Sequence, residues 1–356
     1  MNGLRAIAAM IVMVFHTDQF SHYFGLISLG FWKTKMQSYA VILFFVLSGF
    51  LITFLLMKDN EKNGRINIRN FYMRRILRTW PLYYLVLIIG ALLLAFLPGQ
   101  IDQGIKHNLF ITVLTYGILV PNIAAFLGYA PDIISILWSV GAEEQFYAFW
   151  PLLVNNTKKL LDRIVLFLFA YLALKYLLTW FNFPDKAWSL AEYMPFDCMA
   201  IGGIAACLYN SRSKVLAIIY HPAIQVFAWL FFGFSVFYQP LRIPFLGMLN
   251  TDLHAVMYAV IILNISTNAK TLVSLENKLL NFLGKISYGI YGYHFIVLFL
   301  LSLCLKNTIA VLPSPAAHAM IFISEIAITI FIAFLSNHYF EAWFLRKKER
   351  YRMPGV

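Results

Sequence analysis

The first apolar segment of the chain, residues 3–22, carries an arginine and a histidine whose spacing suits one site. Arg5 and His16 are eleven residues apart, almost three helical turns, so their side chains fall on nearly the same face, about 16 Å apart. Histidine is the most frequent general base in enzymes, and ionisable groups inside a membrane span usually line a pathway or a site. The alternatives are a snorkelling arginine at the membrane boundary and a histidine that hydrogen-bonds a neighbouring helix.

Three arginines, Arg74, Arg75 and Arg78, lie in the run FYMRRILRTWPLYYL at the start of another apolar segment. A guanidinium group is planar and binds phosphate oxygens in pairs, so this cluster predicts a docking site for a phosphate-bearing cofactor. The competing interpretation is that the arginines follow the positive-inside rule and bind anionic lipid headgroups. The cluster is denser than topology alone requires.

Two adjacent glutamates, Glu143 and Glu144, lie in the middle of the apolar run LWSVGAEEQFYAFWPLL. Adjacent residues on a helix point about 100° apart, so the two carboxylates cannot have the same role. Carboxylates inside a membrane span are costly, and we expect a function for at least one of them. A structural polar clamp is the alternative for the other.

Asp197 in PFDCMAIGG and His294 in ISYGIYGYHF are further polar residues within apolar segments, and we expect both to line a cavity. Glu325, which also lies in an apolar segment, is expected to pair with one of them. Small residues in such segments more often allow close helix packing, and they include Ser48, Gly49, Gly202 and Gly203.

The scaffold that must hold these residues is a membrane domain, because 61% of the 356 residues are hydrophobic and only 12% are charged. Soluble domains carry about 25% charged residues, and a soluble fold cannot hide this much apolar surface. A spanning helix needs about 20 apolar residues. The sequence thus predicts an all-α, polytopic bundle of about ten transmembrane helices. The segments that qualify are 3–22, 38–57, 79–97, 134–154, 162–181, 190–209, 214–236, 250–267, 283–304 and 317–340.

The distribution of Lys and Arg predicts the orientation of the bundle and argues against nucleic-acid binding, despite a net charge of +12. With the N-terminus in the cytoplasm, 21 of the 28 basic residues fall in cytoplasmic segments, and both termini are expected there. The apolar stretch 109–128 is interpreted as a re-entrant or interfacial piece, because a further span would reverse every later loop. The opposite loops hold only Lys33, Lys35, Lys106, Lys186, Arg242 and Lys306.

Seven strings of the chain, taken in order, resemble the bacterial membrane acyltransferases of family three, which O-acylate surface and secreted glycans. The resemblance covers nearly the whole chain. The strings are GLRAIAAMIVMVFH, FFVLSGFLIT, RRILRTWPLYYL, LWSVGAEEQFYAFWPLL, FDCMAIGGIAA, LGKISYGIYGYH and LSNHYFEAWF.

The resemblance assigns residues of this chain to three motifs of that family. An arginine and a histidine separated by ten residues on the first helix match Arg5 and His16. A basic motif between the second and third helices matches the arginine cluster at 74–78. A tryptophan-to-tyrosine motif that contains the glutamates matches Trp138, Ser139, Glu143, Glu144, Phe146 and Tyr147.

What the resemblance implies is transfer of an acyl group, usually acetyl from acetyl-CoA, to a sugar hydroxyl on the outer side of the bacterial inner membrane. A neutral His16 would take the proton of the sugar hydroxyl while a carboxylate, for instance Glu143, orients the ring; in a variant, His16 carries the acyl group. No metal is expected. The expected roles are catalytic for His16, Glu143 and Glu144, cofactor-binding for Arg5, Arg74, Arg75 and Arg78, and substrate-binding for Trp138, Ser139, Tyr147, Asp197 and His294.

The acceptor stays open at this point: peptidoglycan, the O-antigen of lipopolysaccharide, an exopolysaccharide, a lipid-linked sugar or a small secreted glycoside would all supply a hydroxyl. Acetyl and succinyl groups would use the same residues. We expect a membrane acyltransferase domain at 1–345, a basic cytoplasmic tail at 346–356, and no C-terminal esterase-like domain. The alternative function is a secondary transporter of a glycan precursor or another anionic solute, although no inverted repeat is recognisable.

Overall fold

The computed structural model describes residues 1–31, 36–96, 109–155, 159–181, 192–238, 243 and 246–351. These residues form helices and turns and contain no strand, so the predicted all-α class is confirmed. Several basic residues of the predicted charge asymmetry lie outside the described residues, namely Lys33, Lys35, Lys106, Lys158, Lys186, Arg242 and Arg352.

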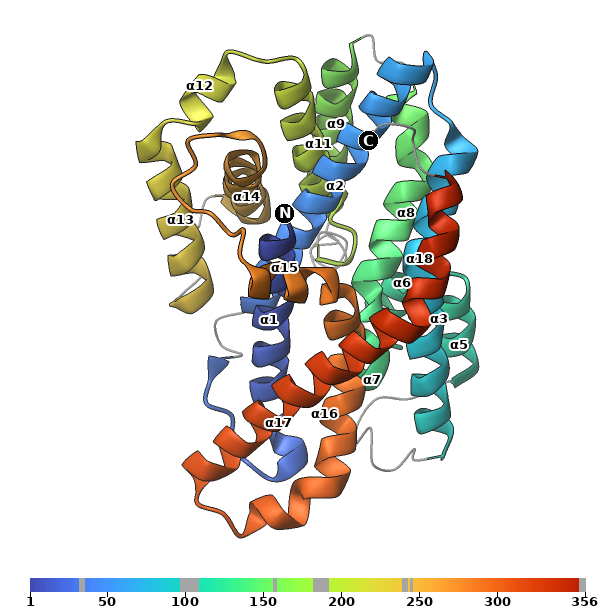
Figure 1. Ribbon diagram of the computed structural model, residues 1–356, viewed down its shortest axis with the longest axis vertical. Helices are drawn as coiled ribbons and strands as arrows, with labels where there is room; N and C mark the ends of the chain where they lie inside the picture. Colours follow the sequence, from blue (N-terminus) through green and yellow to red (C-terminus); the bar gives the residue numbers. More distant parts are fainter. Residues whose placement is uncertain are drawn as a thin grey trace. The chain divides into compact units, whose positions relative to one another are not determined.

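Each of the ten predicted apolar segments is largely helical over the part that is described, although 214–236 is divided between α12 and α13 at Tyr220–His221 (Figure 1). The prediction succeeds because a run of apolar residues in a bilayer must satisfy its backbone groups internally, and a helix does this within one segment. The helices are α1 (Asn2–Gln19), α2 (Met36–Asn63), α3 (Ile68–Phe96), α8 (Leu137–Val154), α9 (Leu160–Trp180), α11 (Phe196–Asn210), α12 (Val215–Ile219), α13 (Pro222–Phe237), α14 (Leu249–Thr267), α16 (Ser287–Ala310) and α17 (Ser314–Leu335).

By length and composition, five helical stretches of the described chain could cross a membrane, and the chain is a multi-pass membrane protein. Other predicted spans are shorter or more polar: α11 has 15 residues, α13 has 16, and the 18 residues of α8 include both glutamates. The five stretches are Gln37–Asn63, Ile68–Phe96, Leu249–Thr267, Ser287–Ala310 and Ser314–Tyr351.

The apolar stretch 109–128 is broken into two short helices, α5 (Leu109–Gly117) and α6 (Pro121–Phe126). Leu119 between them has a φ of 62°, in the left-handed region, and Pro121 then begins α6. Nine residues of helix are about 13 Å long, less than half of the hydrocarbon thickness of about 30 Å. Neither helix is therefore long enough to cross a bilayer.

The chain divides into two compact units that are interleaved along the sequence. Unit 1 contains Met1, Ser38–Phe71 and Ala142–Leu275, and unit 2 contains Asn2–Gln37, Tyr72–Gly141 and Glu276–Val356. Helices α3 and α8 each begin in one unit and continue in the other.

Unit 1 is built on the close approach of α2 and α11. A Cβ atom on Gly49 would lie 1.9 Å from the main-chain oxygen of Met199, and one on Gly202 would lie 2.1 Å from that of Val46. The two backbones therefore touch, which is the packing that small residues permit between membrane helices. The indole Nε1 of Trp150 on α8 donates to Oγ1 of Thr53 on α2 at 2.8 Å and ties the third helix to this pair.

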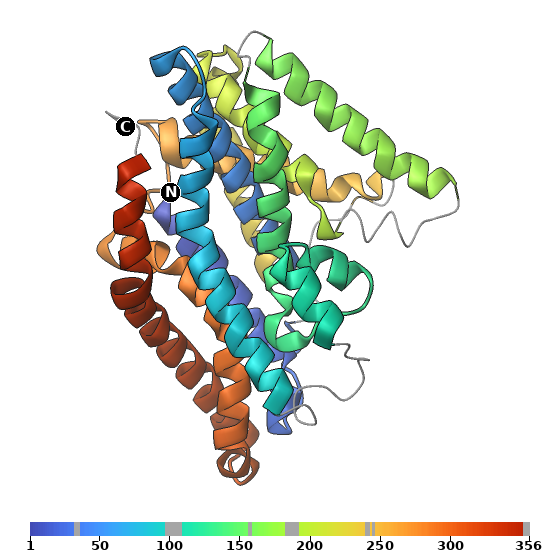
Figure 2. The ribbon, with the colours of Figure 1, turned by 90° about the vertical axis from the view of Figure 1, so that its right-hand side faces the viewer.

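Unit 2 is built around α16, which packs against α1 and α17. Both ribbon views show α16 and α17 as neighbouring helices joined by a tight connection (Figures 1 and 2). The short helix α15 (Lys278–Lys285) packs on the start of α1, where a Cβ on Gly284 would lie 2.2 Å from the main-chain oxygen of Asn2.

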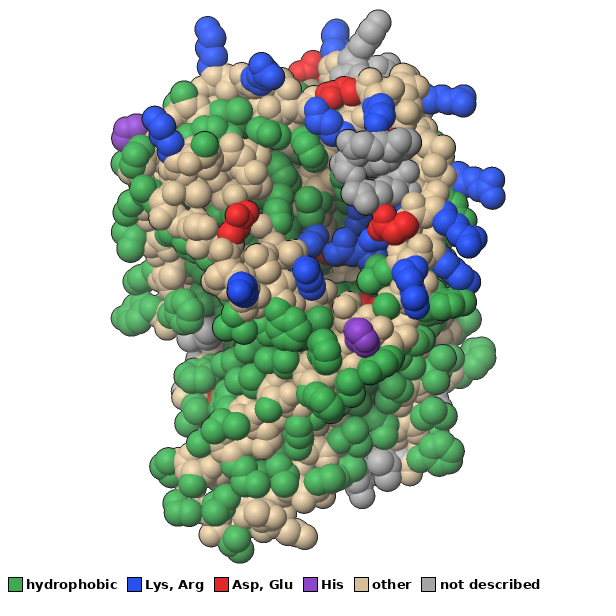
Figure 3. All heavy atoms as spheres, viewed as in Figure 1, with side chains coloured by type: hydrophobic (Ala, Val, Ile, Leu, Met, Phe, Trp, Pro, Cys, Tyr) green, Lys and Arg blue, Asp and Glu red, His purple; other side chains and the backbone are tan. Residues whose placement is uncertain are grey.

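The surface of the last helices of unit 2 changes from apolar to basic along the chain. Over α17 the visible surface is largely hydrophobic, and Ile323 and Phe331 are among the exposed side chains (Figure 3). Lys and Arg gather over α18 (Ala342–Lys348), which contains Arg346, Lys347 and Lys348 (Figure 3). This order is typical of a lipid-facing helix that ends at a membrane–water interface.

We predict that Gly202→Leu destabilises the protein by roughly 1–3 kcal/mol or more, because the new side chain would have to displace the backbone of α2. The matched control is Gly233→Leu on α13, where a Cβ meets nothing within 4 Å. Thermal unfolding in detergent, followed by fluorescence-detected size exclusion, measures both. Equal losses in the two variants would contradict the close approach of α2 and α11.

Candidate active site

The predicted site residues divide between the two units. Unit 1 holds Glu143, Glu144, Tyr147 and Asp197. The contacts described below lie within one unit or the other. Unit 2 holds Arg5, His16, Arg74, Arg75, Arg78, Trp138, Ser139 and His294.

The centre of the polar residues in unit 2 is a direct contact between two histidines. Nδ1 of His16, in the last turn of α1, lies 2.9 Å from Nε2 of His294 on α16. The two rings are nearly parallel, at 4°. Nδ1 of His294 lies 2.8 Å from the main-chain oxygen of Tyr291, one turn earlier on α16. His294 is buried, whereas His16 is only half-buried.

Aromatic rings surround the half-buried His16. The ring of Phe295 lies 4.6 Å from the imidazole between centroids, Phe15 lies at 5.6 Å and Phe20 at 6.4 Å. All three phenylalanines are buried. These neighbours limit the rotation of the ring and place it in an apolar setting, in which electrostatic and hydrogen-bonding interactions are stronger than in water.

The first turn of α8 joins the same group of residues through Tyr291. The hydroxyl groups of Ser139 and Tyr291 lie 2.8 Å apart, and both lie within hydrogen-bond distance of the main-chain oxygen of Ile136, so that one hydroxyl donates to the other and the second donates to Ile136. Ser139, predicted to bind substrate, therefore contacts a residue of α16 that lies one helical turn before His294. Trp138 precedes it on α8.

The arginine cluster is connected to α16 in a similar way. The hydroxyl of Tyr288 on α16 donates to the main-chain oxygen of Thr79, which directly follows Arg78, at 2.9 Å. Tyr288, Tyr291 and His294 are spaced by three residues and therefore follow one side of α16 over about 9 Å. One helix thus links the arginine cluster, the start of α8 and His16.

The arginines themselves are half-buried on α3 and meet the C-terminal part of the chain. Nη1 of Arg74 donates to the main-chain oxygen of Tyr351 at 2.8 Å. Arg78 lies within electrostatic range of the buried carboxylate of Glu341, which accepts from Ser336 at 3.3 Å. Glu341 ends η4 (Ser336–Glu341), a π-helical turn, and such turns are frequent at functional sites.

The glutamates of unit 1 lie in a second polar cluster. Oε1 of Glu143 accepts from the hydroxyl of Ser48 on α2, and Oε2 accepts from the hydroxyl of Tyr147, both at 2.7 Å. The side chain that contacts Nδ1 of His16 is His294, whereas the sequence suggested a carboxylate such as Glu143. Glu144 is half-buried and follows on the same helix.

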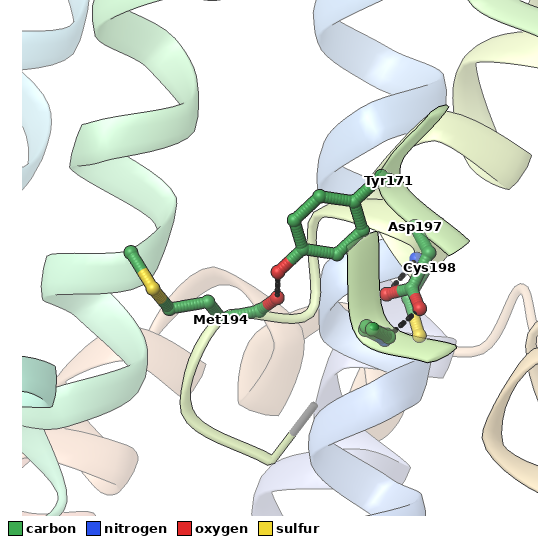
Figure 4. Close-up of polar contacts among 5 residues, drawn as sticks. Tyr171, Met194, Asp197 and Cys198 are labelled. Carbon is green, nitrogen blue, oxygen red and sulfur yellow. Dashed lines mark hydrogen bonds and ion pairs between the residues drawn. The ribbon is translucent and has the colours of Figure 1, made fainter. Parts of the chain in front are cut away.

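Asp197 belongs to a buried ion pair in unit 1. Its carboxylate accepts from Nζ of Lys175 on α9 and, at 2.9 Å, from the main-chain N–H of Cys198. The phenol of Tyr171 donates to the main-chain oxygen of Met194 beside this pair (Figure 4). Lys175, for which the sequence predicted no role, is thus the buried partner of Asp197.

Glu325 on α17 does not meet His294, one of its two expected partners. Its Oε1 accepts from Thr329 one turn later on the same helix, at 3.0 Å. Within the described ranges, His, Cys, Asp and Glu side chains form no group that could hold a metal ion.

Sequence reasoning missed four residues that contact the predicted site residues or their neighbours. Tyr288 and Tyr291 precede His294 at intervals of three in SYGIYGYH, a spacing that places them on one side of a helix. Ser48 was taken for a packing residue because small residues usually are, but its hydroxyl donates to Glu143. Glu341 stands in the string LSNHYFEAWF, to which no role was attached.

The family of the chain follows from comparison with known proteins. The acyltransferase 3 family model, described as an acyltransferase domain, matches residues 1–338. The chain therefore belongs to the acyltransferase 3 family.

The relatives of this chain include proteins named as O-acetyltransferases. It is 27% identical to the peptidoglycan O-acetyltransferase OatA of Listeria monocytogenes, over 96% of this chain and 54% of that protein. It is 23% identical to the putative peptidoglycan O-acetyltransferase YrhL of Bacillus subtilis, with the same coverage. A putative O-acetyltransferase of Staphylococcus aureus strain COL is 28% identical over 43% of this chain and 24% of its own.

Two curated relatives match this chain over 96% of its residues, and the chain spans about half of their length. No solved structure matches it.

We predict that Tyr147→Phe lowers the stability of the protein by about 1–3 kcal/mol, because it removes one of the two hydroxyl donors to the Glu143 carboxylate. The control is Tyr176→Phe, which removes a 3.3 Å hydrogen bond from an exposed tyrosine of the same unit. Thermal unfolding in detergent compares the two. If the unfolding temperature of Tyr147→Phe is no lower than that of the control, the hydrogen bond to Glu143 does not contribute to the stability of the protein.

Proposed function

We propose that this enzyme moves an acetyl group from cytoplasmic acetyl-CoA to a hydroxyl of a glycan on the outer side of the bacterial inner membrane. The family match and the names of the relatives support O-acetylation of a glycan. Because two relatives are named as peptidoglycan O-acetyltransferases, a peptidoglycan sugar is the acceptor that we propose to test first.

The observation that carries the proposal is the contact of His16 with His294 in an apolar setting. In the proposed reaction, neutral His16 takes the proton of the sugar hydroxyl as its oxygen attacks the thioester carbonyl carbon. The C–O bond forms, the C–S bond breaks, and the imidazolium returns the proton to the departing thiolate. The products are the acetylated sugar and CoA. In the variant mechanism, His16 itself carries the acetyl group between donor and acceptor.

The arginines of α3 fit the phosphate groups of an acyl-CoA donor. Arg74 and Arg78 are four residues apart, which places them on one face of α3, where two guanidinium groups would bind separate phosphates. Glu341 near Arg78 and the main-chain oxygen of Tyr351 near Arg74 would hold the two groups in place. Acetyl-CoA, when bound, supplies the activated acyl group.

The membrane orientation predicted from the sequence is consistent with donor binding at the arginines and acceptor binding near His16. The asymmetry of Lys and Arg along the sequence assigns Arg74, Arg75 and Arg78 to the cytoplasmic side, where acetyl-CoA is made available. It assigns the end of α1 with His16 to the outer half, from which the glycan would enter. Both termini are cytoplasmic in this proposal.

We predict that His16→Ala lowers acetyl transfer by about 10²–10⁴-fold, the usual contribution of a general base, while the protein still folds. The control is His22→Ala, an exposed histidine six residues later. Transfer of labelled acetyl from acetyl-CoA to peptidoglycan fragments in proteoliposomes measures the effect.

Three outcomes of that assay separate the mechanisms. Labelled acetyl trapped on the protein without acceptor, and absent in His16→Ala, would establish the acyl-carrier variant. Substantial transfer by His16→Ala would remove His16 from the chemistry. Uptake of a glycan precursor without any transfer of acetyl would instead indicate a transporter.

We predict that Arg78→Lys raises the KM for acetyl-CoA by roughly tenfold and changes saturated turnover little, because lysine cannot bind a phosphate through two parallel hydrogen bonds. Lys347→Gln, which alters a basic side chain on α18, is the control. Initial rates over a range of acetyl-CoA concentrations give both constants. An unchanged KM in Arg78→Lys would leave the arginines with a role in membrane topology only.

A further inference from the structure

We propose that His294 fixes the tautomer of His16 and thereby makes Nε2 of His16 the atom that takes the proton of the acceptor hydroxyl. This inference rests on the proposed function and assigns the direction of each hydrogen bond in the chain from Tyr291 through His294 to His16. It makes His294 a positioning residue, in place of the substrate-binding role that the sequence suggested.

The first step is the protonation of His294. A main-chain oxygen can only accept a hydrogen bond, so Nδ1 of His294, 2.8 Å from the oxygen of Tyr291, carries a hydrogen. His294 is 1% exposed, lies against the ring of Phe295 at 4.8 Å, and its nitrogens face main-chain oxygen of α16, that of Tyr291 included, and Nδ1 of His16. A charged imidazolium without a carboxylate partner would be costly there. His294 is therefore neutral, and its Nε2 has no hydrogen.

The second step follows from the contact between the rings. Nε2 of His294 can only accept, and Nδ1 of His16 lies 2.9 Å away, so Nδ1 of His16 carries the hydrogen. A neutral imidazole has one N–H group. The lone pair of His16 is therefore on Nε2, the nitrogen that faces away from His294 around the ring.

The third step concerns the charge that forms during the reaction. When Nε2 of His16 takes a proton, the ring becomes an imidazolium, and its Nδ1–H donates a stronger, charge-assisted bond to His294. A neutral histidine stabilises this charge less than a carboxylate would. The proton is therefore readily returned to the thiolate when the C–S bond breaks. Both nitrogens of His294 are engaged in this arrangement, which leaves none for a substrate.

The test compares two near-identical amide substitutions at position 294. In His294→Gln, the terminal amide oxygen can occupy the place of Nε2 and accept from His16. The shorter amide of His294→Asn reaches only the place of Nδ1. We expect His294→Asn to lower kcat by about 10²-fold or more with an unchanged KM for acetyl-CoA, and His294→Gln to recover at least tenfold of that loss. His318→Gln, at a buried histidine of α17 in the same unit, controls for the loss of a buried imidazole.

A second measurement reads the tautomer without any turnover. Solid-state NMR of ¹⁵N-histidine-labelled protein in proteoliposomes, with the His16 signals assigned by their loss in His16→Gln, should show a protonated Nδ1 and an unprotonated Nε2. A proton on Nε2 of His16, or equal activities of His294→Gln and His294→Asn, would overturn the inference. If His16 has the expected tautomer but His16→Ala still transfers acetyl, the proposed function fails while the assignment of the tautomer stands.

Discussion

No water reaches the hydrocarbon core of a bilayer, so a polar side chain within a spanning helix needs a partner from the protein itself. This constraint organises both units of the enzyme. Within the described chain, His16 contacts His294, Glu143 accepts from Ser48 and Tyr147, and Lys175 pairs with Asp197. All of these contacts except that of Tyr147, which lies on the same helix as Glu143, join different helices, so these polar residues also hold the helices together.

Helix α16 is the element on which the polar residues of unit 2 depend. Three of its side chains lie at intervals of three residues. Tyr288 contacts α3, which carries the arginines; Tyr291 contacts the first turn of α8; and His294 contacts the end of α1. A regular helix therefore sets the separation between the arginines that are proposed to bind the nucleotide and the histidine that is proposed to act on the thioester. A long, thin acyl donor suits such a separation, because its charged and reacting ends are far apart.

The two polar clusters of unit 1 differ in character. Glu143 is half-buried and accepts hydrogen bonds from two neutral hydroxyl groups. Asp197 is buried against Lys175, and breaking such a pair would leave an uncompensated charge inside the protein. The contacts thus favour a structural role for Asp197, whereas functional roles for Glu143 and Glu144 stay predictions from the resemblance to the family.

The helices could be predicted from the sequence because they depend on local composition, and the stretch 109–128, interpreted as a re-entrant or interfacial piece, is broken into the short helices α5 and α6. Arg5, His16 and the arginine cluster could also be chosen as candidates from the sequence, since they lie in strings of the family. The residues that contact the candidates could not be predicted. His16 and His294 are 278 residues apart, and Ser48 and Glu143 are 95 apart. Helical periodicity says which side of a helix a residue occupies, but not which helix faces it, because that choice is made by packing between segments distant in sequence.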